Sequence, residues 1–260
     1  MFLFGVINAS PDSLNTDSIV GTPDDAATRA ALLLAGGCNG FDLGGQGSTG
    51  IAGEADPETE WSRLAPVIPT LVAHGVPISV DTWRPSVARR ALDAGVTWLN
   101  AADGLQTDAM IEVVAERQCP VVLPFLNGPD PLKLEHIAPG FDPVKFLIEF
   151  FDDRLAALRR RGVTDNIVID PGTGFAPHNW DWNDRFVYQK EVYSRLGELR
   201  RFGLPLYIAL PWKRTAQHDE LLEIVVGQQP EYGRVHYPTV VRAAEARAAG
   251  SAATTGPSTS

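Results

Sequence analysis

Eight short apolar runs alternate with amphipathic stretches along this chain, and this alternation limits the folds that it can adopt. The runs cover residues 2–8, 40–44, 77–81, 97–100, 120–125, 166–170, 205–210 and 233–236. Polar residues seldom interrupt them, which is typical of strands that are buried on both faces of a parallel sheet. We therefore expect each run to form a β-strand.

An amphipathic stretch follows each run and is expected to form a helix. The expected helices cover residues 23–35, 58–74, 85–94, 108–117, 143–161, 184–202, 216–226 and 239–249. Strict alternation of strand and helix implies parallel strands with right-handed crossovers. Eight such units in 260 residues match the size of a (β/α)8 TIM barrel, an α/β fold.

Two further features bear on the architecture. An open, doubly wound sheet is the alternative to a barrel, but no G-x-G-x-x-G turn follows the first strand, which weakens a dinucleotide-binding interpretation. Residues 250–260 are rich in Ser, Thr, Ala and Gly, a composition that favours disorder. We expect one barrel domain over residues 1–249 and a disordered tail over residues 250–260.

The charge and the N-terminal segment exclude several partners and locations. The formal net charge is −10, which argues against nucleic acid or an anionic membrane surface, because both attract basic proteins. The N-terminal segment has no basic region and only a short apolar run, unlike a signal peptide. No apolar run approaches the roughly 20 residues of a membrane span. A cytoplasmic protein is therefore expected.

Polar side chains end nearly every expected strand, at the rim where a TIM barrel carries its active site. They are Asn8, Asp42, Asp81, Asn100, Asp170, Lys213, Arg234 and His236. One such residue alone is more often a turn or capping residue, but capping poorly explains so many at one rim. Carboxylates and amides facing a cavity, with cations on one side, suit a donor-rich heterocycle that carries an anionic arm.

Each part of such a ligand has a candidate partner in the sequence. A carboxylate accepts the adjacent N–H donors of an aminopyrimidinone edge. Lys213, Arg234 and His236 follow the last two strands, where barrels often bind phosphate. Asn8 offers an oxygen to Mg²⁺, which is usually held by few protein ligands together with substrate phosphates.

Six motifs, in the same order, resemble those of the dihydropteroate synthase family of pterin-binding enzymes. Residues 8–13 (NASPDS), 42–46 (DLGGQ) and 78–82 (ISVDT) are similar to the family's N-x-T-P-D-S, D-[IL]-G-G-E and I-S-[IV]-D-T. Residues 99–100 (LN), 170–175 (DPGTGF) and 234–236 (RVH) stand where the family has I-N-D, D-P-G-x-G-F and R-V-H. The resemblance covers nearly the whole chain.

The resemblance implies a transferase that joins a pterin methyl-pyrophosphate to an amine, p-aminobenzoate in the family, with loss of Mg²⁺-bound pyrophosphate. It implies a pterin site made by Asp81, Asn100 and Asp170, with Lys213 beside it. Lys213, Asp81 and Asp170 are the expected catalytic residues, and Asp42 is expected to join the substrate-binding set. By the same resemblance, Asn8 would bind the metal and pyrophosphate, and Arg234 and His236 the leaving phosphates. A homodimer formed through outer helices is also implied.

The sequence departs from the family pattern where the second substrate and pyrophosphate would bind. Residues 48–52 (STGIA) replace S-T-R-P-G, and residues 211–213 (PWK) replace S-R-K, so the serine that would face the benzoate carboxylate is absent. A different acceptor amine is therefore a second interpretation.

Single residues depart as well, at Leu14, Ala101 (with Asp103 nearby) and Pro177. The family has a phenylalanine, an aspartate and a lysine at these places. Three tryptophans are candidates to line an aromatic cleft in the altered region, namely Trp180, Trp182 and Trp212.

Three other activities remain as alternatives. A methyltetrahydrofolate-dependent methyltransferase would share the pterin floor and would need no pyrophosphate-binding cations, but Lys213 and the R-V-H motif favour the synthase. A non-catalytic pterin-binding protein would fit the altered loops. An aldolase or isomerase would use Lys213 as a Schiff-base amine, which requires a desolvated lysine.

Overall fold

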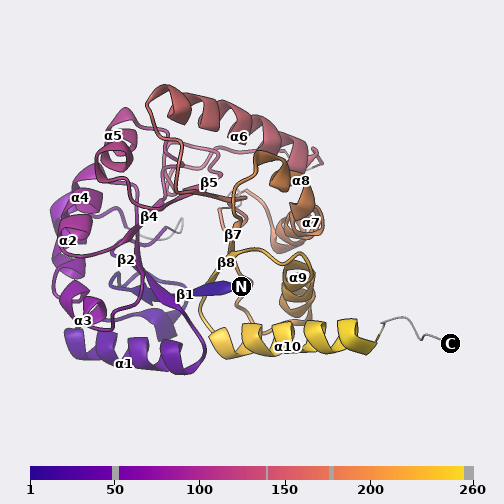
Figure 1. Ribbon diagram of the computed structural model, residues 1–260, viewed down its shortest axis with the longest axis horizontal. Helices are drawn as coiled ribbons and strands as arrows, with labels where there is room; N and C mark the ends of the chain where they lie inside the picture. Colours follow the sequence, from indigo (N-terminus) through magenta and orange to yellow (C-terminus); the bar gives the residue numbers. More distant parts are fainter. Residues whose placement is uncertain (49–52, 139, 176–178, 255–260) are drawn as a thin grey trace.

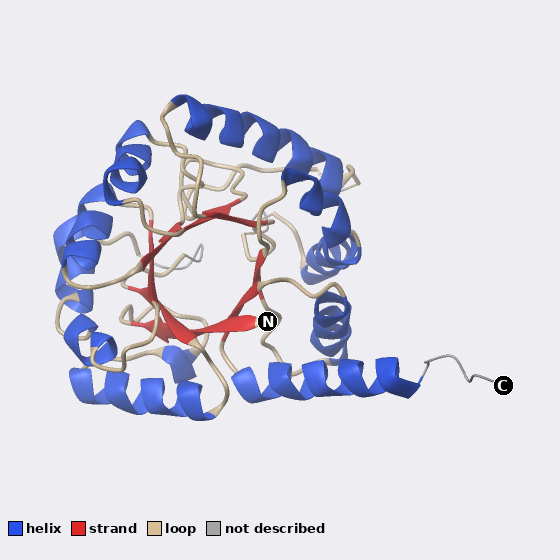
Figure 2. Ribbon diagram, viewed as in Figure 1, coloured by secondary structure: helices blue, strands red, loops and turns tan. Residues whose placement is uncertain are grey.

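The strands form one parallel sheet that closes into a barrel surrounded by helices (Figures 1 and 2). The computed structural model describes residues 1–48, 53–138, 140–175 and 179–254. The strand order is β6-β5-β4-β3-β2-β1-β8-β7. A parallel bridge between Ile169 and Leu206 joins β6 to β7, and the Ile169 N–H donates to the Pro205 carbonyl at 3.0 Å. The expected (β/α)8 barrel is therefore confirmed.

The eight strands lie close to the expected positions. They are β1 (Phe2–Asn8), β2 (Gly40–Gly44), β3 (Ile78–Thr82), β4 (Trp98–Ala101), β5 (Val121–Pro124), β6 (Ile167–Asp170), β7 (Tyr207–Ala209) and β8 (Tyr232–Val235). The largest difference is at β7, which is shorter than the expected 205–210. Pro205 has no N–H with which to join the ladder.

The helices form the outer layer of the molecule (Figure 2). They are α1 (Pro23–Ala35), α2 (Pro57–Leu64), α3 (Ile68–Val72), α4 (Pro85–Asp93), α5 (Asp108–Arg117), α6 (Pro143–Arg160), α7 (Trp182–Ser194), α8 (Leu196–Leu199), α9 (Ala216–Gly227) and α10 (Pro238–Thr254), with short 3₁₀ turns η1 (Thr16–Ser18) and η2 (Arg200–Phe202). Aspartate or threonine side chains cap the first turns of α1, α2, α5, α6, α7 and α9. Within the described ranges, no helix is both long and apolar enough to cross a membrane.

Three helical segments differ from the sequence prediction. The expected helix 58–74 is divided into α2 and α3, because Pro66 and Pro69 interrupt the helical hydrogen bonds. The expected helix 184–202 is divided at Arg195, which leaves helical geometry at φ −115° and ψ 17°. The last helix continues to Thr254 rather than ending at residue 249, as its alanines favour helix. The rest of the expected tail, 255–260, lies outside the described residues.

The interior of the barrel is filled by side chains rather than hollow. Phe4, Val122, Val168 and Tyr207 form one buried cluster, against which the aromatic rings of β1, β4 and β8 pack. The Phe4 and Trp98 ring centroids are 5.2 Å apart. A second, larger apolar cluster includes the buried faces of helices such as α1, α4 and α6. The packed interior leaves the C-terminal rim of the strands as the place for a site.

Candidate active site

Strand register brings the expected polar residues together at one end of the barrel. Parallel pairing places Asn8 opposite Gly44, Gly44 opposite Asp81, and Asp81 opposite Asn100. These residues therefore form a row across four neighbouring strands, while Asp170 ends β6 on the far side. Gly44 leaves room in the row, since a Cβ atom there would come within 3.3 Å of Asn8 Oδ1.

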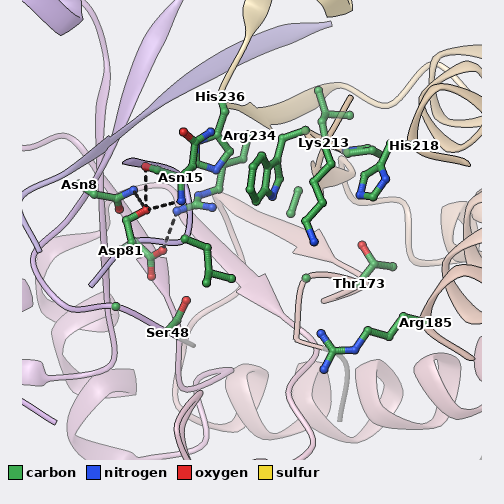
Figure 3. Close-up of a pocket in the computed structure, with 18 of the residues that line it drawn as sticks. Asn8, Asn15, Ser48, Asp81, Thr173, Arg185, Lys213, His218, Arg234 and His236 are labelled. Atoms are coloured by element: carbon green, nitrogen blue, oxygen red, sulfur yellow. Dashed lines mark hydrogen bonds and ion pairs between the residues drawn. The ribbon is translucent and has the colours of Figure 1, made fainter. Parts of the chain in front are cut away.

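A cavity of about 260 Å³ opens above this row. Of the expected site residues, five line it: Asn8, Asp81, Lys213, Arg234 and His236. The other three, Asp42, Asn100 and Asp170, are buried at 0%, 7% and 4% exposure. Figure 3 shows two sides of the cavity, with Asn8, Asp81, Arg234 and His236 on one and Lys213, His218, Thr173 and Arg185 on the other.

Arg234 forms the centre of a charged cluster, which we call the floor together with Asp42, Asp81, Asn100 and Asp170. Its Nε donates to Asp42 Oδ2 at 2.5 Å, and its Nη2 donates to Asp81 Oδ2 at 3.4 Å. Burial disfavours the charged guanidinium, but the two carboxylates outweigh burial and raise the pKa of Arg234. Arg234 is thus a fixed cation inside the barrel mouth.

The carboxyls of Asp81 and Asp170 are difficult to ionise. Burial raises the pKa of Asp81 to about 7, and repulsion from Asp42 adds to this while Arg234 opposes it. Burial likewise raises the pKa of Asp170 to about 7, against the hydrogen bond that the Gly172 N–H donates to its Oδ1 at 2.8 Å. Near neutral pH, a ligand that offers N–H donors therefore favours the ionised form of both carboxyls and lowers their pKa.

The turn after β6 requires glycine at position 172. Gly172 has φ +64°, and a Cβ atom there would lie 2.0 Å from the Phe125 carbonyl oxygen. The close approach of the two chains keeps Asp170 buried beneath the rim.

Two further polar groups near Asp42 were not anticipated from the sequence, Tyr207 and Ser79. The Tyr207 hydroxyl, Ser79 Oγ and Asp42 Oδ1 are buried without a hydrogen-bond partner among the described residues. Burial raises the pKa of Tyr207, and Asp42 adds to the effect. Both residues lie inside apolar strands, where the sequence does not tell an inward polar group from a packing residue.

The orientation of the Asn8 amide is fixed by two serines. Asn8 Nδ2 lies 3.0 Å from Ser13 Oγ and 2.7 Å from Ser18 Oγ. Both hydroxyls donate to the Asn15 carbonyl oxygen, so they accept from Asn8. Asn8 Oδ1 remains as an acceptor at the cavity, which fits a Mg²⁺ ligand that is completed by substrate phosphates.

His236 is a neutral group at this site. Burial lowers its pKa to about 3, and the neighbouring Arg234 and Arg29 contribute. The Arg29 guanidinium donates to the His236 carbonyl oxygen at 2.9 Å, which holds the turn after β8. His236 would therefore meet a phosphate through hydrogen bonds rather than through charge.

Lys213 lies between two tryptophans. Its Nζ is 5.7 Å from the Trp182 ring centroid and 5.8 Å from that of Trp212. Trp182 in turn stacks on His218, with centroids 4.5 Å apart and planes 1° apart. Lys213 is exposed, so it lacks the desolvation that a Schiff-base lysine needs, and the aldolase interpretation loses its basis.

One face of α7 lines the cavity opposite the floor, and the sequence indicated only Trp182 of it. Trp182, Arg185, Gln189 and Tyr193 follow one another at helical spacing and all line the cavity. Gln189 Nε2 donates to the Thr173 carbonyl at 3.0 Å, and the Tyr193 hydroxyl bonds Thr173 Oγ1 at 2.8 Å. We call Trp182, Arg185, Gln189, Trp212 and Lys213 the wall.

Several residues named from the sequence lie outside the cavity. Trp180 is 5% exposed and packs against Tyr188, so of the three tryptophans only Trp182 and Trp212 line the cleft. Asp103 is buried and accepts from the Leu105 N–H and the Thr107 hydroxyl, which makes it a turn residue. The departures at 49–52 and Pro177 fall outside the described residues.

Comparisons with known proteins agree with this geometry. Residues 4–254 match the model of the pterin binding enzyme family. The type-2 dihydropteroate synthase of Escherichia coli is 32% identical over 219 residues, covering 82% of this chain and 77% of that protein.

Two solved structures were also compared. The Yersinia pestis dihydropteroate synthase shares the fold, with a TM-score of 0.83 at 23% identity, covering 97% of this chain and 94% of that one. The Thermus thermophilus enzyme, solved with 4-aminobenzoate, has a TM-score of 0.78 at 26% identity, covering 96% and 93%. The chain belongs to the pterin-binding enzyme family, as a transferase related to the dihydropteroate synthases.

Proposed function

We propose that this protein joins a pterin methyl-pyrophosphate to an arylamine and releases pyrophosphate. The observation that carries the proposal is the buried floor, in which Asp42 and Asp81 hold one fixed arginine and Asp170 lies near enough to interact electrostatically with it. The family membership and the relatives' names support the same reaction. The floor residues suit the flat, donor-rich edge of a pterin.

The floor would bind and orient the pterin. An ionised Asp81 or Asp170 accepts the ring's N–H donors, and Asn100 supplies an amide to the remaining ring atoms. The planar guanidinium of Arg234, held by Asp42 and Asp81, offers a face on which a heterocycle can stack. When the methylene carbon becomes cationic, the nearby carboxylates stabilise its charge.

The rim would hold the pyrophosphate. Asn8 Oδ1 is the proposed ligand of Mg²⁺, which when bound would neutralise charge on the departing phosphates. Lys213 supplies a positive charge at the opposite side of the cavity, and His236 supplies hydrogen bonds. The carbon–oxygen bond breaks with its electron pair remaining on pyrophosphate. The amine lone pair then forms the carbon–nitrogen bond, and the amine loses a proton to solvent.

Pyrophosphate release and product mass test the proposal together. The purified protein is mixed with dihydropterin pyrophosphate and Mg²⁺, with and without p-aminobenzoate. We expect tight pterin binding by calorimetry, and pyrophosphate released with a product of the combined mass only when the amine is present. Binding without release would favour a non-catalytic pterin protein or a methyltetrahydrofolate enzyme. Absence of pterin binding would remove the proposal.

The assembly and the location of the protein stay predictions. We infer a homodimer formed through outer helices, from the family resemblance and from the exposed Phe146 on α6 and Val187 on α7, which are 37% and 62% accessible. Light scattering after gel filtration should give twice the chain mass, and a chain-mass particle would contradict this. The expected location is the cytoplasm.

A further inference from the structure

Among the described residues, three Lys and Arg side chains line the cavity, and of these Arg185 comes from a helix. Arg234 is neutralised by Asp42 and Asp81. Lys213 follows β7 in the same loop as Trp212, and the Trp212 ring lies against that of His236. Arg185 projects from α7 on the opposite side, below Thr173 in Figure 3. The wall therefore includes a guanidinium on the side of the cavity away from Asn8.

Pro211, which follows β7, offers no donor to a carboxylate. Pro211 lines the cavity there, and proline has neither a hydroxyl nor a backbone N–H to donate. Trp212 follows it with an indole in place of a charged group. An anionic group entering the cavity finds no donor at Pro211.

Arg185 is held in place by a buried scaffold. Its Nε donates to the Trp180 carbonyl oxygen at 3.2 Å. Trp180 is itself fixed, because its indole N–H donates to the Ile137 carbonyl at 2.7 Å and its ring packs on Tyr188. Such support reduces the entropy that the long arginine side chain loses when it binds an anion.

Trp182 and Arg185 are placed to contact the ring and the anionic end of one small molecule. They are three residues apart on α7, which corresponds to a rise of about 4.5 Å along one helix face. An aromatic ring beside Trp182 would carry its para substituent toward Arg185. The planar fork of a guanidinium matches a carboxylate better than the point charge of a lysine does.

We propose that Arg185 anchors the carboxylate of the acceptor and so determines acceptor specificity. This inference rests on the proposed function, since it presumes that an arylamine enters the cavity beside the pterin. The amine end then points to the floor, and the carboxylate end points to α7. Arg185 takes the role that Pro211 cannot supply in this chain.

Two acceptors that differ only in the carboxylate test the anchor. Initial rates of pyrophosphate release are measured with p-aminobenzoate and with p-toluidine, which carries a methyl group instead. In the Arg185→Gln variant we expect the KM for p-aminobenzoate to rise about 10- to 100-fold, as for a lost charge-assisted hydrogen bond. The kcat should stay within about twofold, and kcat/KM for p-toluidine should not change. Arg185→Lys should recover part of the loss.

The controls separate an anchor from a structural role. Arg89→Gln removes an arginine that pairs with Glu116 on the outer surface and should leave both acceptors unaffected. An equal loss with both acceptors in Arg185→Gln, or no change from wild type, would overturn the anchor.

Direct binding separates the two hypotheses from each other. Calorimetry of p-aminobenzoate is run on the pterin-loaded wild type and on the Arg185→Gln variant. Binding that is lost in the variant, without turnover in the wild type, would retain the anchor and reject the proposed reaction. Turnover with unchanged p-aminobenzoate binding in the variant would retain the reaction and reject the anchor.

Discussion

The floor and the wall of the cavity are built by different parts of the fold. The floor residues come from β2, β3, β4, β6 and β8, and strand register and ion pairs fix them. The wall residues come from α7 and from the loop after β7. Lys213 lies against Trp182 and Trp212, and the remaining wall contacts reach α9 and the loop after β6. A change in the floor disturbs several strands, whereas a change in the wall disturbs a single face. This explains how the floor keeps family motifs while the wall departs from them.

The strongest way to break the floor is to remove one of its carboxylates. Asp81→Asn loses an ionised acceptor for pterin donors and a partner of Arg234. With two charge-assisted hydrogen bonds lost, we expect kcat/KM for the pterin substrate to fall about 1,000-fold. Asp103→Asn, which alters another buried aspartate outside the cavity, should lower stability and keep kcat/KM per folded molecule. Similar kinetic losses in both variants would contradict a special role for the floor.

The floor also predicts an unusual dependence of stability on pH. The pKa values of Asp81 and Asp170 are raised to about 7 in the folded protein, so the folded state holds protons that the unfolded state has released above about pH 4. Their contribution is therefore full below pH 4 and is lost as pH rises toward 7. The effect amounts to at most about 4 kcal/mol for each carboxyl.

Urea unfolding of the ligand-free protein between pH 5 and pH 8 measures this effect. We expect the free energy of unfolding to fall as pH rises. In the Asp170→Asn variant this fall with pH should be smaller. Asp25→Asn removes an exposed helix-capping carboxylate whose pKa is lowered, so it should shift stability equally across this range. A wild-type curve that is flat, or that rises with pH, would reject the raised pKa values.

The sequence predicted the floor far better than the wall, for a physical reason. Asp81, Asn100 and Asp170 follow buried strands, and parallel strands that close into a barrel must bring such residues to one rim. Arg185 and Gln189 lie on a helix whose surface positions are polar in any soluble protein. The packing of α7 against the loop after β6, through Thr173, contributes to turning that face toward the cavity.

The same contrast explains the smaller errors. Trp180 and Trp182 are two residues apart, yet the first is buried with Tyr188 and the second lines the cleft. Near the start of a helix, the hydrophobic pattern of the sequence does not distinguish a buried tryptophan from one that lines the cleft. The split of the expected helix 58–74 was visible in its prolines, which outweigh the amphipathic pattern.

Lys213 belongs to the wall but is expected to bind the pyrophosphate of the pterin substrate, so its replacement sharpens the distinction between floor and wall. Lys213→Met keeps much of the side-chain volume and removes the charge between Trp182 and Trp212. We expect kcat to fall about 100-fold, as for other lost electrostatic contacts to a charged transition state, with pterin affinity nearly unchanged. Lys190→Met, in which the lysine pairs with Glu220 away from the cavity, is the matched control. A loss of pterin affinity alone would assign Lys213 to the floor.

The smallest expected effect comes from changing the wall toward the family pattern. Pro211→Ser returns a hydroxyl and a backbone N–H to the end of β7, beside the cavity. One or two neutral hydrogen bonds to the acceptor carboxylate should lower the KM for p-aminobenzoate about fivefold, and p-toluidine should show no gain. Combined with Arg185→Gln, the serine should recover part of the lost affinity, because it would donate to the carboxylate that the arginine no longer binds. An unchanged KM in both backgrounds would mean that the acceptor passes far from β7, and the carboxylate site would then belong to α7 alone.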